Sequence, residues 1–151
     1  MEIELGDLSS KPVIELLEAH LTEMYATSPP ESIHALDVSK LKDPKITFWI
    51  CRRNDELLGC IAIKELDDRH GEIKSMRTSA KARKQGIASS LLSHLIDVAR
   101  ERGYHRLSLE TGAMDFFKPA RTLYEKFGFQ YGDPFGDYVP DPNSKFMTRT
   151  L

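Results

Sequence analysis

A cluster of cations lies directly before a predicted helix in the middle of this chain. It holds five basic residues within eleven positions and no acidic residue, although the whole chain has a formal net charge of −2. A local positive field on a nearly neutral protein indicates one anionic ligand rather than a nucleic-acid surface. A solvated basic loop before an ordinary helix is the alternative that residue types leave open. The five residues are Lys74, Arg77, Lys81, Arg83 and Lys84.

The turn from Arg83 to Ala88 suits a phosphate group. It leads directly into the helix, whose first turn has free backbone N–H groups and the positive end of the helix dipole. Gly86 and Ala88 carry little or no side chain, so a pyrophosphate can approach the backbone closely. The chain contains neither G-x-x-x-x-G-K-[ST] nor G-x-G-x-x-G, which disfavours a P-loop or dinucleotide-binding protein.

The helix after this turn has the clearest periodicity in the sequence. Its apolar residues recur at intervals of three and four and form one stripe, whereas polar and charged residues take the other face. Gly103 ends the helix. We therefore predict a strand, a basic turn and an amphipathic helix between Gly71 and Arg102. The stripe consists of Ala88, Leu91, Leu92, Leu95, Ile96 and Ala99.

Two motifs in this chain resemble those of the GNAT superfamily of N-acetyltransferases. Arg83-x-x-Gly86-x-Ala88 matches the family's Arg/Gln-x-x-Gly-x-Gly/Ala signature. About 35 residues later, the run from Ala120 to Phe129 is similar to its closing A-x-x-L-Y-x-x-x-G-F motif, with a strand predicted between the two. The resemblance extends over nearly the whole chain and is closest to small bacterial acetyltransferases whose substrates are mostly unassigned.

The resemblance implies acetyl-CoA as co-substrate and a place for each part of it. Backbone groups of Met76, Arg77 and Thr78 would hold the pantetheine arm, and the Met76 N–H would polarise the thioester carbonyl. Arg83 or Lys84 would add charge near the phosphates. The pyrophosphate would lie on backbone N–H groups of Lys84, Gln85, Gly86, Ile87, Ala88 and Ser89.

Two carboxylates and one tyrosine are the catalytic candidates. Glu72 lies four residues before Met76, where some family members carry a catalytic glutamate, and partial desolvation would raise its pKa. It could instead bind a cationic substrate or pair with Lys74. Glu110, on the partner strand, is the second candidate for the base. Many family members use no strong base and bind the amine neutral.

Tyr124 matches the family tyrosine whose hydroxyl reaches the cofactor sulfur, so the resemblance assigns it as the acid. The alternative is a core aromatic, since other apolar residues share its helical face. The chain departs from the family at Phe117, where an asparagine that contacts pantetheine is often found. That contact is therefore missing or replaced.

Residues for the acceptor are harder to identify. In the family, the N-terminal helical region forms one wall of the acceptor site, so His34 and Asp37 are weak candidates; a surface histidine and a helix-end aspartate are the alternative. The Gly-, Pro- and Asp-rich loop 132–143 should border the site through Asp137 and Tyr138, and its acids would favour a cationic amine.

The predicted fold is α/β (α+β), with a mixed, mostly antiparallel sheet flanked by helices. Strand–helix–strand units are parallel with a right-handed crossover, so strands 72–78 and 106–111 should be parallel neighbours. The resemblance implies that these fourth and fifth strands splay apart around the cofactor. The other predicted strands are 2–5, 46–53, 57–66, 127–131 and 145–151. The other predicted helices are one that starts within residues 9–12 and is broken by residues 28–30, then 31–41 and 116–126.

Length and composition fit one globular domain over residues 1–151, with 40% hydrophobic and 29% charged residues. No apolar run has the roughly 20 residues that span a bilayer, and we expect a cytoplasmic protein without membrane or nucleic-acid partners. Cys51 and Cys60 flank a hairpin turn, are expected as buried free thiols and could face each other across it. The histidines form no ligand pair, so we expect no metal site.

Two functions follow from these patterns. The first is an acetyl-CoA-dependent N-acetyltransferase that acts directly on an amine of a small molecule or a protein, with a homodimer as the assembly common among similar proteins. The second is a relative of the same fold that binds acyl-CoA as a sensor or regulatory module without turnover. The paired motifs favour the enzyme.

Overall fold

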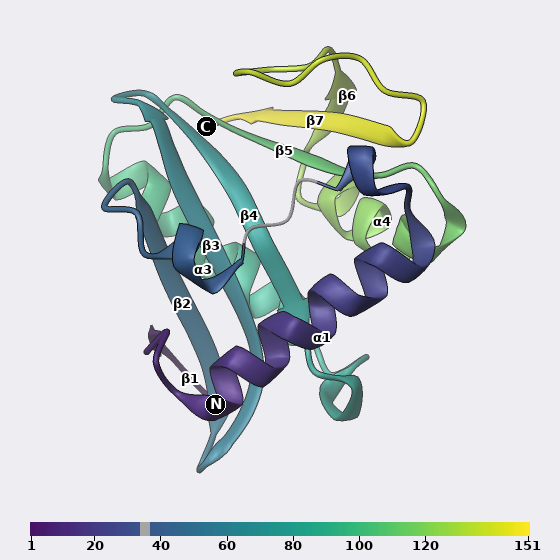
Figure 1. Cartoon of the computed structure of the whole chain (residues 1–151). Coiled ribbons are helices and arrows are strands. Elements are labelled where there is room, and N and C mark those ends of the chain that lie inside the picture. The colour runs from purple at the N-terminus through teal and green to yellow at the C-terminus, as the bar shows by residue number, and fades with distance from the viewer. Residues whose placement is uncertain (34–36) are drawn as a thin grey trace.

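The structure is a computed structural model that describes residues 1–33 and 37–151. Within these residues, seven strands form one sheet in the order β1-β2-β3-β4-β5-β7-β6 (Figure 1). The strands are β1 (Glu2–Leu5), β2 (Ile46–Arg53), β3 (Glu56–Asp67), β4 (His70–Thr78), β5 (Arg106–Gly112), β6 (Gln130–Gly132) and β7 (Ser144–Thr150). The helices are α1 (Lys11–Thr27), α2 (Val38–Leu41), α3 (Ile87–Glu101) and α4 (Lys118–Lys126), with 3₁₀ turns η1 (Pro30–Ser32), η2 (Ala80–Ala82) and η3 (Asp115–Phe117).

Helices cover both faces of the sheet. The apolar stripe of α3, apart from the half-buried Ala88, is buried against one face, where it packs with Ile61, Ile63 and Leu109. On the other face, α1 buries Leu16 and Leu17 against Phe48. In Figure 1, α1 crosses the near face and α3 lies behind the sheet. None of the described helices is long and apolar enough to cross a bilayer.

The sheet opens between β4 and β5, which confirms the predicted fold class. These strands run parallel but pair only at their beginnings, from His70↔Arg106 to Glu72↔Ser108. Beyond that point β4 continues to Thr78 beside β3, whereas β5 pairs with β7. A bulge in β4 accompanies the divergence, because one extra residue lies between the pairs that β4 makes with β3 and Ser75 has a φ of 53°. The bulge turns the backbone of β4 into the gap.

Three predicted elements differ from the structure. Residues 31–41 do not form one helix: η1 ends at Ser32, and α2 begins only at Val38, because the Asp37 carboxylate accepts the Lys40 N–H at 2.9 Å and starts a new helix. The helix expected from residue 116 begins at Lys118 after a 3₁₀ turn. Strand β6 starts at Gln130 rather than at residue 127, because Gly128 has a φ of +86° in the cap of α4.

Cys51 and Cys60 are buried free thiols, as predicted. The expectation that they face each other is wrong. In the β2–β3 ladder, Cys51 lies opposite Gly59 and Cys60 lies opposite Ile50. This offset of one residue places the thiols on opposite faces of the sheet, Cys51 beneath α3 and Cys60 beneath α1.

Candidate active site

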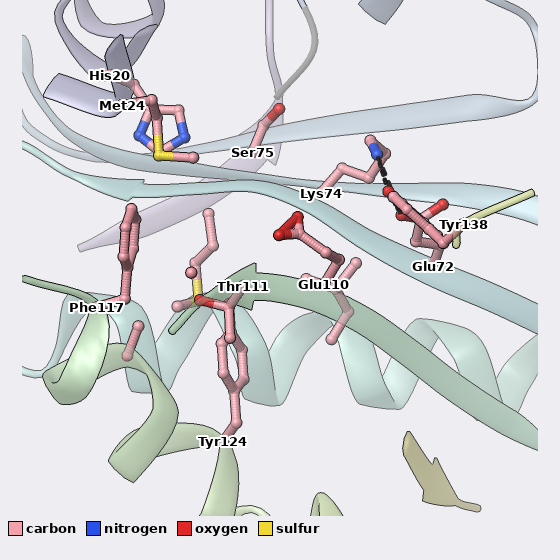
Figure 2. Close-up of a pocket in the computed structure, with 14 residues that line it drawn as sticks. His20, Met24, Glu72, Lys74, Ser75, Glu110, Thr111, Phe117, Tyr124 and Tyr138 are labelled. Atoms are coloured by element: carbon pink, nitrogen blue, oxygen red, sulfur yellow. Dashed lines mark hydrogen bonds and ion pairs between the residues drawn. The ribbon is translucent and has the colours of Figure 1, made fainter. Parts of the chain in front are cut away.

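A cavity of about 100 Å³ occupies the gap between β4 and β5. Strand β4 contributes one wall, β5 the opposite wall, and α1 and α4 close the sides. Figure 2 shows Phe117 at one end of the cavity, Tyr138 at the other, and Glu110 between them. The cavity therefore lies in the gap between strands in which the resemblance places the cofactor.

The basic turn has the geometry of a phosphate site. Lys84 and Gly86 both have positive φ, and Gly86 is the N-cap of α3. The first helical hydrogen bond runs from the Ser90 N–H to the Gly86 carbonyl at 3.0 Å, which leaves the N–H groups of Ile87, Ala88 and Ser89 without partners inside the helix. A Cβ added at Gly86 would meet no heavy atom within 4 Å, so the space before these groups is open. This arrangement fits an anionic pyrophosphate.

The side chains around the turn have different positions. Lys81, Arg83, Lys84 and Gln85 are exposed. Gln85 is held locally, since its amide oxygen accepts a hydrogen bond from Arg53 at 3.3 Å. The turn therefore presents its backbone N–H groups and a positive field, and the exposed side chains of Lys81 and Lys84 can extend toward a bound anion.

Arg77 points away from the cavity. Its guanidinium, only 9% exposed, donates two hydrogen bonds to the Glu23 carboxylate of α1, one of them 2.7 Å long. Arg83 adds a weaker contact to the same carboxylate at 3.4 Å. The Arg77 side chain thus fastens α1 to β4, and only its backbone is available to pantetheine.

We expect Glu23→Gln to lower the free energy of unfolding by about 1–3 kcal/mol, because it leaves the buried guanidinium without a charged partner. Hydrogen bonds from Arg77 lower the pKa of Glu23. The stabilisation is therefore present above the unfolded pKa and is lost as pH falls through the folded pKa. Urea titrations between pH 3 and 7 would measure it. Glu15→Gln, in an exposed pair with Lys11 on the same helix, is the control and should change little; equal loss in both variants would contradict this role.

Tyr124 reaches the cavity from α4. Its hydroxyl lies 3.7 Å from the Met76 sulfur, a weak acceptor, and its ring packs edge-on against Phe129. Burial, with a smaller effect from Glu110, raises the pKa of Tyr124 above its ordinary value. The hydroxyl therefore stays protonated and can donate to a sulfur on the cavity side.

Glu72 is buried and tightly held. Its carboxylate accepts hydrogen bonds from the Tyr138 hydroxyl and from Lys74 Nζ, the latter at 3.1 Å. Lys74 Nζ also donates to the Tyr138 hydroxyl at 2.9 Å (Figure 2). Burial, followed by the charge of Glu72, raises the pKa of Tyr138. This network fixes the Glu72 carboxylate in place and leaves it less available for proton transfer.

Glu110 is the carboxyl best suited to proton transfer. It lies on β5 where the strands have diverged, and Figure 2 shows it pointing into the middle of the cavity. Burial raises its pKa to about 7; a hydrogen bond from Ser144 and the charge of Lys74 oppose this effect, and the carboxylates of Glu72 and Asp141 add to it. A carboxyl with a pKa near neutrality can accept a proton and release it again at physiological pH.

The cavity also contains two residues that the sequence interpretation missed. His20 and Met24 of α1 line it opposite β5. Burial, with a further effect from Arg77, lowers the pKa of His20 to about 4, so its imidazole is neutral at pH 7. His20 lies three and four residues after the buried Leu17 and Leu16, so the helical stripe of α1 carried a signal for it.

Asp37 and Asp137, two of the remaining predicted acceptor residues, lie at the surface. Asp37 is exposed, caps α2 and does not line the cavity. Asp137 is exposed at the rim of a neighbouring cavity. His34 lies outside the described residues. Across those residues, no group of three His, Cys, Asp or Glu side chains forms a metal site.

Sequence and structure comparisons agree on the family. The sequence model of the Acetyltransferase (GNAT) family matches residues 11–129, including both motifs. The chain is 58% identical over 151 residues to the uncharacterized N-acetyltransferase YsnE of Bacillus subtilis, with 100% of both chains covered. It is 47% identical over 149 residues to the uncharacterized N-acetyltransferase YedL of Escherichia coli, covering 99% of this chain and 94% of that protein.

A solved structure gives the same answer. A protein from Klebsiella pneumoniae, assigned as an acyl-CoA N-acyltransferase, is 30% identical with a TM-score of 0.84, covering 99% of this chain and 97% of that one. The acetyltransferase prediction is therefore confirmed, and the non-catalytic alternative is not favoured. The chain belongs to the GNAT family of N-acetyltransferases, enzymes that move an acetyl group from acetyl-CoA to an amine.

Proposed function

We propose that this enzyme acetylates a primary amine of a small molecule or a protein by direct attack on the thioester. The observation that carries the proposal is the pairing, in one cavity between the splayed strands, of Glu110, with a pKa near 7, and Tyr124, whose hydroxyl stays protonated. One group can take a proton and the other can give a hydrogen bond. The acetyl donor, acetyl-CoA, supplies an activated carbonyl and a thiolate leaving group.

Each residue has one part in the transfer. The amine nitrogen attacks the carbonyl carbon, the C–S bond breaks, and the amine proton passes to Glu110. Tyr124 donates a hydrogen bond to the leaving sulfur, and the Met76 N–H polarises the carbonyl. Glu72, our first choice from the sequence, becomes a positioning residue because Lys74 and Tyr138 already hold its carboxylate.

The first experiment is calorimetric titration with acetyl-CoA and CoA. Wild-type protein should bind both at micromolar Kd, and Gly86→Glu should abolish binding, because a carboxylate would occupy the open space before the N–H groups of α3. Gly103→Glu is a matched control: Gly103 also has a positive φ and open space around it, but lies at the other end of α3. Folded wild-type protein that binds neither acetyl-CoA nor CoA would contradict the proposal.

An acceptor screen then tests turnover. A panel of primary amines, amino acids and lysine peptides, followed by release of the CoA thiol, should give at least one amine that is acetylated at a rate above background hydrolysis. Binding without acetylation of any amine would instead favour the acyl-CoA sensor.

The same proposal covers location and assembly. Two buried free thiols fit a reducing compartment such as the cytoplasm, where acetyl-CoA is made and used. We expect a homodimer, as is common among similar proteins, and light scattering on the purified protein would measure its mass.

A further inference from the structure

A second cavity lies directly beside the catalytic one. It is formed by Lys64 and Leu66 of β3 and by residues 136–139 of the loop between β6 and β7. The two cavities share Glu72, Lys74 and Tyr138, so these three side chains form the wall between them. In Figure 2, Tyr138 and Glu72 stand at that end of the catalytic cavity. An acceptor that lies across this wall has its amine on the side of Glu110 and the rest of its body in the second cavity.

The second cavity combines a free cation with apolar surface. Among the described residues, Lys64 has no ion-pair partner, whereas Lys74 is paired with Glu72. Lys64 also lines a further cavity with Lys40, Lys42 and Asp43, where the lysines outnumber the acid. The apolar part is Leu66 and Val139, of which Val139 is 71% exposed.

The acids of the loop counter this charge only in part. Asp141 accepts hydrogen bonds from the Ser32 hydroxyl at 2.6 Å and from the Asn143 N–H at 2.8 Å, so its carboxylate is used to hold the loop. Asp137 lines the second cavity itself, but it is exposed, so water screens its charge more than that of the half-buried Lys64. Lys64 therefore makes this cavity suited to an anionic group, whereas the sequence analysis expected the loop acids to favour a cationic amine.

The sheet fixes the distance between the two ends of such an acceptor. Lys64 pairs with Glu72, which pairs with Ser108, and Glu110 lies two residues beyond Ser108. Strands about 4.8 Å apart and a rise of about 3.3 Å per residue would separate the Lys64 and Glu110 backbones by roughly 12 Å in an unbroken sheet, and the divergence of β5 from β4 makes the separation larger. An amine and a carboxylate on one carbon are too close together to reach both residues.

Resting on the proposed function, we infer that the acceptor is an elongated amine with an apolar body and a carboxylate at its far end, which binds Lys64 while its amine meets Glu110. Amino acids with the amine at the end of a chain and the N-terminal amines of short peptides have this form. The Tyr138 ring, whose hydroxyl bonds with Glu72 and Lys74, must turn aside to admit the chain.

The test compares amines that differ at one end. The probes are 6-aminohexanoate, 8-aminooctanoate, hexylamine, 1,6-diaminohexane and glycine, measured by thiol release with saturating acetyl-CoA. In the wild type, kcat/KM for 6-aminohexanoate or 8-aminooctanoate should exceed that for hexylamine by about tenfold, and glycine should be poorest. Lys64→Gln should remove this preference with hexylamine unchanged, and Lys64→Glu should shift it to 1,6-diaminohexane. Lys126→Gln, an exposed lysine at the end of α4, is the control.

The outcomes separate this inference from the function on which it rests. Hexylamine as good as 6-aminohexanoate, or a carboxylate preference that survives in Lys64→Gln, overturns the inferred substrate class and leaves the acetyltransferase intact. Acetylation of other panel amines but none of these probes overturns it as well. Acetylation of no amine at all overturns the proposed function itself.

Discussion

Tyr124→Phe is expected to lower kcat by about 10²-fold while acetyl-CoA binds as tightly as in the wild type. The hydroxyl is needed as the C–S bond breaks and charge develops on sulfur, so its loss affects the transition state more than the bound substrate. In the structure the hydroxyl's partner is the Met76 sulfur at 3.7 Å, a contact weak enough to exchange for another sulfur. Steady-state kinetics with an acceptor from the screen, together with calorimetry, would measure both quantities.

The control separates chemistry from packing. Tyr131→Phe removes an exposed hydroxyl that donates to Glu125 at 2.8 Å on edge strand β6, and it should leave kcat unchanged. Tyr124→Phe keeps the ring against Phe129, so the free energy of unfolding, measured by thermal denaturation, should change by no more than about 1 kcal/mol. A Tyr124→Phe enzyme with wild-type kcat would show that Tyr124 is a core aromatic, the alternative that its helical face had left open.

Local patterns were sufficient to predict the turn and the helix that we expect to hold the cofactor. The stripe of α3 is set by residues three and four apart, and Gly86 marks its start, so the turn before it is readable without any tertiary information. The parallel placement of β4 and β5 follows from the helix that connects them. Short elements were less readable: four-residue α2 depends on one cap, Asp37, rather than on periodicity.

The acceptor side depends on contacts between distant segments. Tyr138, 66 residues after Glu72, donates a hydrogen bond to the Glu72 carboxylate, while burial in the cavity raises the pKa of Glu110. The sequence of one strand cannot show that contact. It also cannot show that β5 stops pairing with β4 before Glu110 and so carries Glu110 into the cavity. Cys51 and Cys60 likewise point to opposite faces of the sheet because of the register between β2 and β3, which the sequence of the turn did not predict.

Glu110→Gln is expected to reduce kcat/KM about 10²-fold at pH 8 and to remove one inflection from the pH profile. A base works when it is deprotonated. With a pKa of about 7, Glu110 should make wild-type kcat/KM rise with pH and level above that value, apart from ionisation of the amine itself. The variant should show only the amine's ionisation. Glu125→Gln, an exposed glutamate on α4, should keep the wild-type profile.

The free energy of unfolding should also depend on the ionisation of Glu110, but it should fall over the pH range in which kcat/KM rises. Because burial raises the pKa of Glu110 from its ordinary 4.5 to about 7, the folded state binds the proton more strongly than the unfolded state between these values. Unfolding free energy should therefore fall as pH rises from about 4.5 to 7, and Glu110→Gln should lose this slope. A profile that loses its inflection in Glu72→Gln but keeps it in Glu110→Gln would transfer the role of base to Glu72. If Glu110 is the base, the enzyme gains activity over the pH range in which its folded state becomes less stable.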